Sequence, residues 1–98
     1  MRRQPLERTI VAKVMAQARS LGWWAMKTHG GSYGTVVGLP DVMVIKDGRV
    51  AWMEVKRPGE EPTRVQLHRQ RELASHGCHV TTVTSAADAR EFLEGISQ

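Results

Sequence analysis

The stretch GLPDVMVIKDGRVAWMEVK, residues 38–56, decides the fold of this 98-residue chain. At its centre, Asp47-Gly48 separates two apolar runs. An Asp-Gly pair in this setting is a strong local signal for a β-hairpin, because a type I′ turn needs positive φ at both central residues. We therefore predict that residues 41–45 and 50–56 form two antiparallel strands joined by a turn at 46–49.

This hairpin would bring three charged side chains together at its open end. Asp41 begins the first predicted strand, whereas Glu54 and Lys56 lie near the end of the second. Glu54 and Lys56 point to the same side, because side chains alternate faces along a strand. Two carboxylates and an ammonium in one place indicate a site completed by a cation and an anionic substrate. The alternative interpretation is a simple ion-pair network within the hairpin.

The composition is that of an ordinary globular domain, and its charge favours a polyanionic partner. The chain is 41% hydrophobic and 24% charged, with 14 Lys+Arg against 10 Asp+Glu. A net charge of +4 is compatible with nucleic-acid binding but does not establish it. Because Cys78 is the single cysteine, an internal disulfide is excluded and a reducing compartment is favoured. No apolar run reaches the length of a membrane span, so we expect one soluble, cytoplasmic domain covering residues 1–98 and no membrane partner.

Apolar periodicity and turn residues predict the remaining elements. A helix is expected first, followed by a strand, the two strands of the hairpin, a second helix, a last strand and a final helix. The order is therefore αβββαβα, which is an α/β fold. The expected bounds outside the hairpin are 5–21 and 62–77 for the first two helices, 23–29 and 79–84 for the strands, and 85–94 for the last helix.

Several single residues have both a functional and a structural interpretation. Glu7 is either an acid aimed at the carboxylate cluster or a first-turn residue favoured by the helix dipole. Trp23 and Trp24 are consecutive in a predicted strand, so their side chains point to opposite faces and at most one can be in the core. Trp52 shares the face of Glu54 and is expected to pack beneath the first helix. The glycine-rich residues 30–34 are either a flexible connection or a loop that contacts substrate.

A further group of basic side chains could contact DNA phosphates. On the second predicted helix, basic side chains recur at i, i+4 and i+7 as Arg64, His68 and Arg71. Arg69 adds charge beside them. A solvated basic face is the plainer interpretation of the same pattern. The DNA-binding candidates are Lys27, His29, Arg57, Arg64, His68 and Arg71.

The central motif resembles the PD-(D/E)XK nuclease signature, in which Pro-Asp precedes Glu-x-Lys. The wider pattern is similar to the virus-type replication-repair nuclease (VRR-NUC) branch of that superfamily. In that branch a glutamate on the first helix precedes Gly-x-Pro-Asp, Glu-Val-Lys and a glutamine that opens the next helix. The matching residues here are Glu7, Gly38-Leu39-Pro40-Asp41, Glu54-Val55-Lys56 and Gln66.

The resemblance implies a restriction-endonuclease-like core with a mixed central sheet flanked by helices. It also implies a metal-dependent DNA endonuclease with Glu7, Asp41, Glu54, Lys56 and Gln66 as catalytic residues. Mg²⁺, or Mn²⁺ as a substitute, would be held by Asp41, Glu54, the Val55 carbonyl and Glu7. Short stand-alone members resemble homodimeric Holliday (four-way) junction resolvases, so we expect branched DNA as the substrate and a homodimer. The alternatives are a general nickase or flap endonuclease, and a non-catalytic DNA-binding module.

Overall fold

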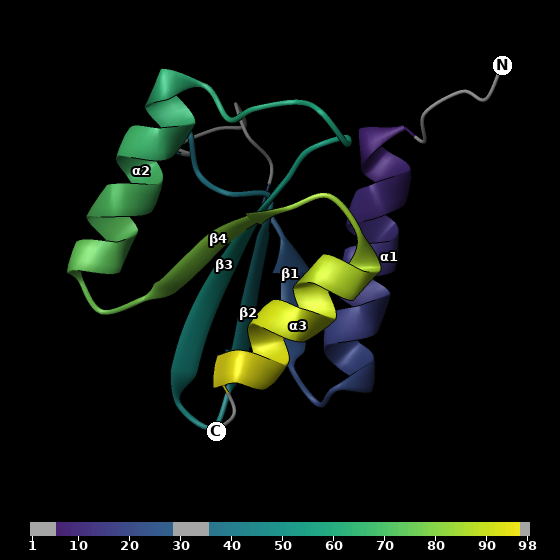
Figure 1. Cartoon of the computed structure of the whole chain (residues 1–98). Coiled ribbons are helices and arrows are strands. Elements are labelled where there is room, and N and C mark those ends of the chain that lie inside the picture. The colour runs from purple at the N-terminus through teal and green to yellow at the C-terminus, as the bar shows by residue number, and fades with distance from the viewer. Residues whose placement is uncertain (1–5, 29–35, 97–98) are drawn as a thin grey trace, which may run out of the picture.

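The computed structural model describes residues 6–28 and 36–96. Two layers of helix enclose one sheet, with α1 and α3 on one side and α2 on the other (Figure 1). The observed order αβββαβα and the mixed sheet confirm the predicted fold class. The elements are α1 (Glu7–Ser20), β1 (Trp24–Lys27), β2 (Val42–Lys46), β3 (Arg49–Val55), α2 (Arg64–Ser75), β4 (His79–Val83) and α3 (Ala86–Ile96).

The sheet has the strand order β1-β2-β3-β4. β1, β2 and β3 pair antiparallel, whereas β3 and β4 pair parallel. A parallel pair needs a long crossover connection, and α2 supplies it. Among the described residues, no helix is long and apolar enough to span a membrane.

The turn between β2 and β3 sets the register of the hairpin. Asp47 has φ of 52° and Gly48 has φ of 77°, so both central residues have the positive φ that a type I′ turn requires. Lys46 pairs with Arg49 beside the turn, and Val42 pairs with Met53 at the far end. The predicted hairpin is therefore confirmed, and its register brings the two carboxylate positions opposite each other.

The hydrophobic core lies between the sheet and the layer formed by α1 and α3. Alternate residues of the strands point into it, as side chains of a sheet must when one face is buried. Trp23 is buried, at 3% exposed, whereas Trp24 is 56% exposed, which confirms that only one of the pair is in the core. The core residues are Ile10, Val11, Val14, Ala18, Trp23, Ala25, Val42, Val44, Ala51, Met53, Val55, Val83, Ala89, Leu93 and Ile96.

Trp52 does not lie beneath the first helix, and that prediction is wrong. Its neighbours Ala51 and Met53 are fully buried in the α1–α3 layer, so Trp52 points to the opposite face, which carries α2. It is half-buried there, in a row with Met43 and Val80. The error arose because β2 and β3 are apolar on both faces, so alternation alone does not say which face receives which helix.

The N-terminus of α2 is closed by a reciprocal cap. Thr63 Oγ1 accepts a hydrogen bond from the Gln66 N–H at 3.2 Å, and Gln66 Oε1 accepts one from the Thr63 N–H at 2.8 Å. This capping box satisfies two otherwise unpaired donors. It begins the helix at Arg64 rather than at the predicted Pro62. It also fixes the side chain of Gln66, which matters for the site described next.

Candidate active site

The end of the β2–β3 hairpin brings Asp41 and Glu54 into contact. Asp41 directly precedes β2, and Glu54 is the residue before the end of β3. Because Val42 pairs with Met53 in an antiparallel register, Asp41 lies opposite Glu54. Asp41 lies close enough to Glu54 for its charge and a side-chain hydrogen bond to raise the pKa of the Glu54 carboxyl. The structure therefore brings together the two acids that the motif predicted.

Glu54 is a buried acid whose charge is poorly compensated by the protein. Its side chain is 1% exposed. Burial, the hydrogen bond with Asp41 and the Asp41 charge, in that order, raise its pKa from 4.5 to about 9, against the opposing effect of Lys56. Glu54 Oε2 accepts a hydrogen bond from Gln66 Nε2 at 3.2 Å. Glu54 Oε1 is buried and accepts no hydrogen bond from a donor in the described part of the chain.

The backbone around Asp41 is tightly held. Asp41 Oδ2 accepts a hydrogen bond from the Val55 N–H at 2.8 Å. The Thr28 hydroxyl donates to the Pro40 carbonyl at 2.6 Å, and the Thr28 N–H donates to the Asp41 carbonyl at 2.8 Å. In an extended strand the N–H and C=O of one residue point to the same side. The Val55 carbonyl therefore also lies on the side of Asp41.

Lys56 and Glu7 lie near this pair of acids without bonding to it. Burial and then the charge of Asp41 raise the pKa of Glu7. The positive charge of Lys56 opposes the rise in pKa at both Glu7 and Glu54. Lys56 makes no ion pair with either acid among residues 6–28 and 36–96, where Arg57–Glu60, Arg69–Glu72 and Arg90–Glu94 are the pairs present.

The described residues contain no group of three His, Cys, Asp or Glu side chains close enough to hold one metal ion. Asp41 and Glu54 thus form a two-carboxylate site, and Glu7 does not complete a group of three with them. The proposed role of Glu7 as a metal ligand stays a prediction, as do the roles of the other site residues.

Gln66 reaches the site from the opposite side of the sheet to α1. Its Oε1 is held in the capping box while its Nε2 donates to Glu54, so one amide connects the start of α2 to the buried acid. Thr63 therefore supports the site, although the motif did not single it out. The signal was present in the sequence as Thr-x-x-Gln at 63–66, the usual pattern of a capping box.

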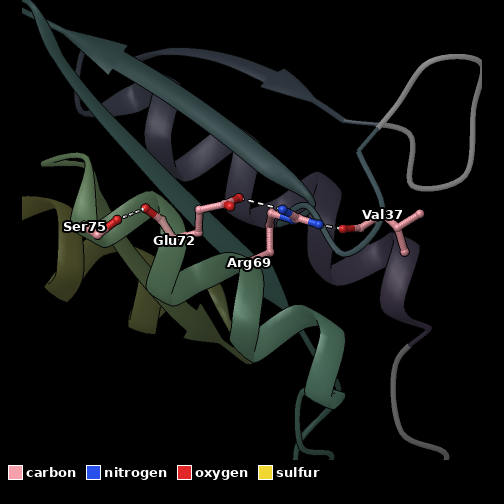
Figure 2. Close-up of polar contacts among 4 residues, drawn as sticks. All are labelled: Val37, Arg69, Glu72 and Ser75. Carbon is pink, nitrogen blue, oxygen red and sulfur yellow. Dashed lines mark hydrogen bonds and ion pairs between the residues drawn. The ribbon is translucent and has the colours of Figure 1, made fainter.

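A second link joins α2 to the loop before Asp41 (Figure 2). Arg69 Nε donates to the Val37 carbonyl at 3.0 Å, and Arg69 Nη1 pairs with Glu72 Oε1 at 2.6 Å. At Gly38, φ is +83°, and an added Cβ would lie 2.5 Å from Val65 Cγ1 and 2.9 Å from the Val65 carbonyl oxygen. Gly38 is thus needed for its conformation and for its close approach to α2. Arg69 positions this loop rather than adding a free charge to the basic face.

The DNA-binding candidates lie in different places. Lys27 is exposed at the end of β1 nearest Asp41, and Arg57 is paired with Glu60 at 3.4 Å. His29 lies outside the described residues. The remaining three, Arg64, His68 and Arg71, are all exposed on α2 and make no ion pair among the described residues.

Comparisons with known proteins agree with this geometry. No family model and no curated protein matches the sequence. One solved structure, described as "VRR_NUC domain", aligns with a TM-score of 0.75 at 24% identity over 90% of this chain and 94% of its own. The chain has the VRR-NUC fold. A second such structure, "VRR_NUC domain protein", aligns with a TM-score of 0.78 at 17% identity over 94% of this chain and 88% of its own. The VRR-NUC fold is that expected from the motif, and Asp41, Glu54 and Lys56 of the motif lie at the open end of the hairpin.

Proposed function

We propose that this chain is a nuclease that hydrolyses DNA phosphodiester bonds with the help of a divalent cation. The observation that carries the proposal is the pair Asp41 and Glu54, placed side by side at the end of a hairpin, with Lys56 nearby and in no ion pair with a described residue. A structural ion-pair network would place the lysine against a carboxylate, and none is formed there among the described residues. The VRR-NUC fold of the solved structures supports the same class of activity.

The oxygen atoms of the site fit a hard divalent cation. Glu54 Oε1 is buried without a partner among the described residues, and an ionised Glu54 beside Asp41 needs a positive charge to offset the repulsion. Mg²⁺ and Mn²⁺ favour carboxylate and carbonyl oxygens, so Asp41, Glu54 and the Val55 carbonyl would hold the ion. When bound, such an ion would polarise the phosphate and favour deprotonation of a water molecule.

The other side chains would act on the substrate, on Glu54 or on a water molecule. Lys56, with no carboxylate partner among the described residues, can donate hydrogen bonds to a phosphate oxygen and offset the negative charge that develops there. Gln66 holds Glu54 in place through its Nε2. Glu7 faces the site from α1 with a raised pKa caused first by burial, so it would hold a water molecule or support a second ion.

The alternative function is that of a DNA-binding module without catalytic activity. Such a module would gain nothing from two carboxylates beside a phosphate, because like charges repel. The pair Asp41 and Glu54 therefore favours the nuclease.

We propose that the substrate is branched DNA, most specifically a four-way junction, and that two chains act as a homodimer. One active site cuts one strand, so paired cuts on opposing strands need two chains related by a two-fold axis. The face of the sheet that carries Glu54 also exposes large apolar side chains on β1, with Trp24 at 56% and Met26 at 38% exposed. A second copy covering these side chains would remove them from water.

Cleavage assays on purified protein test the activity. Linear duplex, flap, fork and four-way junction DNA are offered with Mg²⁺, with Mn²⁺ and with excess chelator. We expect Glu54→Gln and Lys56→Ala to abolish cleavage while junction binding in Ca²⁺ survives, because Ca²⁺ fits the ligands but coordinates too loosely for the chemistry. Glu61→Gln, which changes an exposed acid outside the site, is the matched control. Strong cleavage by either site variant, or full activity in chelator, would overturn these assignments.

Substrate choice and assembly are tested separately. We expect symmetry-related nicks in the junction, poor cleavage of linear duplex and a dimer in sedimentation experiments. A monomer at micromolar concentration would argue against the homodimer, and efficient nicking of plain duplex would favour the general endonuclease.

A further inference from the structure

A groove along the outer side of α1 is separate from the candidate active site. It lies between α1 and the end of β1, has a volume of about 340 Å³ and contains no acidic side chain in its lining. Its floor is apolar and its rim is positively charged. The lining residues are Arg8, Val11, Ala12, Met15, Arg19 and Lys27.

The three cations of this groove are not neutralised by the described part of the protein. Arg8, Arg19 and Lys27 are all exposed, and none of them forms an ion pair within residues 6–28 and 36–96. Arg19 is held in position, because its Nη2 donates to the Ala25 carbonyl on β1 at 3.1 Å. This bond also occupies an outward-facing carbonyl of an edge strand, which disfavours pairing of β1 with another strand.

The groove begins beside the active site and leads away from it. At one end, Arg8 follows Glu7, and Lys27 pairs with Val42, the residue next to Asp41. At the other end, Arg19 is in the last turn of α1. Since Arg19 follows Arg8 by about three turns of helix, the track is roughly 16 Å long at about 1.5 Å per helical residue. That length corresponds to about five base pairs of duplex at roughly 3.4 Å each.

The groove and the basic side chains of α2 lie on opposite sides of the sheet, since α1 and α2 cover opposite faces (Figure 1). The Asp41–Glu54 pair is at the end of the sheet between them. We propose that the α1 groove binds the backbone phosphates of a DNA duplex arm leaving the active site. One chain would then contact DNA on both sides of the cleaved phosphodiester bond. This inference rests on the proposed nuclease function, and it adds Arg8 and Arg19 to the substrate-binding residues.

The test compares charge-removing variants inside and outside the groove. Arg8→Gln and Lys27→Gln each remove one rim charge, and neither side chain makes a hydrogen bond or ion pair among the described residues. Lys13→Gln is the matched control, because it removes the same charge from an exposed position on α1 that does not line the groove. Affinity for labelled junction DNA is measured by fluorescence anisotropy in Ca²⁺ over a range of NaCl concentrations.

The salt slope is the slope of log affinity against log salt concentration, and we expect each groove variant to lower its magnitude by about 0.9 per lost phosphate contact. This change is equivalent to roughly eightfold weaker binding at about 0.1 M salt. The double variant should lose about twice that slope, Arg8→Lys should retain it, and Lys13→Gln should match wild type. If the groove variants bind like Lys13→Gln while wild type binds and cuts DNA, the groove assignment is overturned and the nuclease stands. If wild type neither binds nor cuts any DNA, the proposed function itself is overturned.

Discussion

Replacing Glu54 by Gln should stabilise the metal-free protein at neutral pH, although it removes the proposed catalytic acid. Burial raises the pKa of Glu54 from 4.5 to about 9 in the folded state. Between these values the folded chain keeps the proton and the unfolded chain has lost it. The contribution of Glu54 to the free energy of unfolding is therefore complete below pH 4.5. It decreases as the pH rises, up to about pH 9.

The magnitude follows from that interval. One pKa unit corresponds to about 1.36 kcal/mol, so the roughly 2.5 units from the unfolded value of 4.5 to pH 7 cost the wild type about 3 kcal/mol. The introduced glutamine has nearly the same shape as a protonated glutamate and does not ionise, so the variant avoids this cost. For a domain of this size, roughly 4–8 °C per kcal/mol predicts a melting temperature higher by about 12–24 °C at pH 7. Near pH 4.5 the two proteins should melt together.

The assay is thermal and urea unfolding between pH 4.5 and 8 in chelator, followed by the same measurement with Mg²⁺. Glu61→Gln, at an exposed position, is the control and should follow wild type. Mg²⁺ should raise the melting temperature of wild type, because the ion favours the ionised acid, and should leave Glu54→Gln almost unchanged. A wild-type stability that is constant or rises relative to Glu54→Gln over this pH range would refute the argument from burial.

Three further sets of variants test the supports of the site and the basic face of α2. Gly38→Ala should destabilise the fold by about 2–4 kcal/mol in urea unfolding, because positive φ and close contact with α2 add together. At Gly59, φ is +88° and an added Cβ would have nothing within 4 Å, so Gly59→Ala should destabilise the fold by only about 1 kcal/mol. Equal losses of stability in the two variants would contradict the role of close packing at Gly38. Arg69→Ala should lower turnover about ten- to hundredfold by releasing the loop before Asp41, and unchanged turnover would remove its positioning role. Arg64→Ala and Arg71→Ala should each reduce the salt slope of DNA binding by about one, whereas an unchanged slope would mean that this face is merely solvated.

The central hairpin could be predicted from the sequence, because it depends on residues that are close together in the chain. Asp47-Gly48 permits the positive φ of a type I′ turn, and a two-residue turn fixes the register of the strands that flank it. Once the register is fixed, Asp41 must lie opposite Glu54, so the position of the acidic pair could be predicted without any knowledge of the tertiary structure. The helices were likewise predictable within about two residues, because their caps and apolar spacing are local features.

The surroundings of that pair depend on contacts between residues far apart in the chain. Trp52 was assigned to the wrong helix because β3 is apolar on both faces, and only the packing of α1 and α2 distinguishes them. Arg69 looked like one more cation on a basic face, but its bond to the Val37 carbonyl joins residues 32 positions apart. The α1 groove likewise exists only because β1 folds back along α1, which brings Lys27 beside Arg8. The turn and the register follow from neighbouring residues, whereas the burial, the pKa of Glu54 and the charged groove arise only when separate elements pack together.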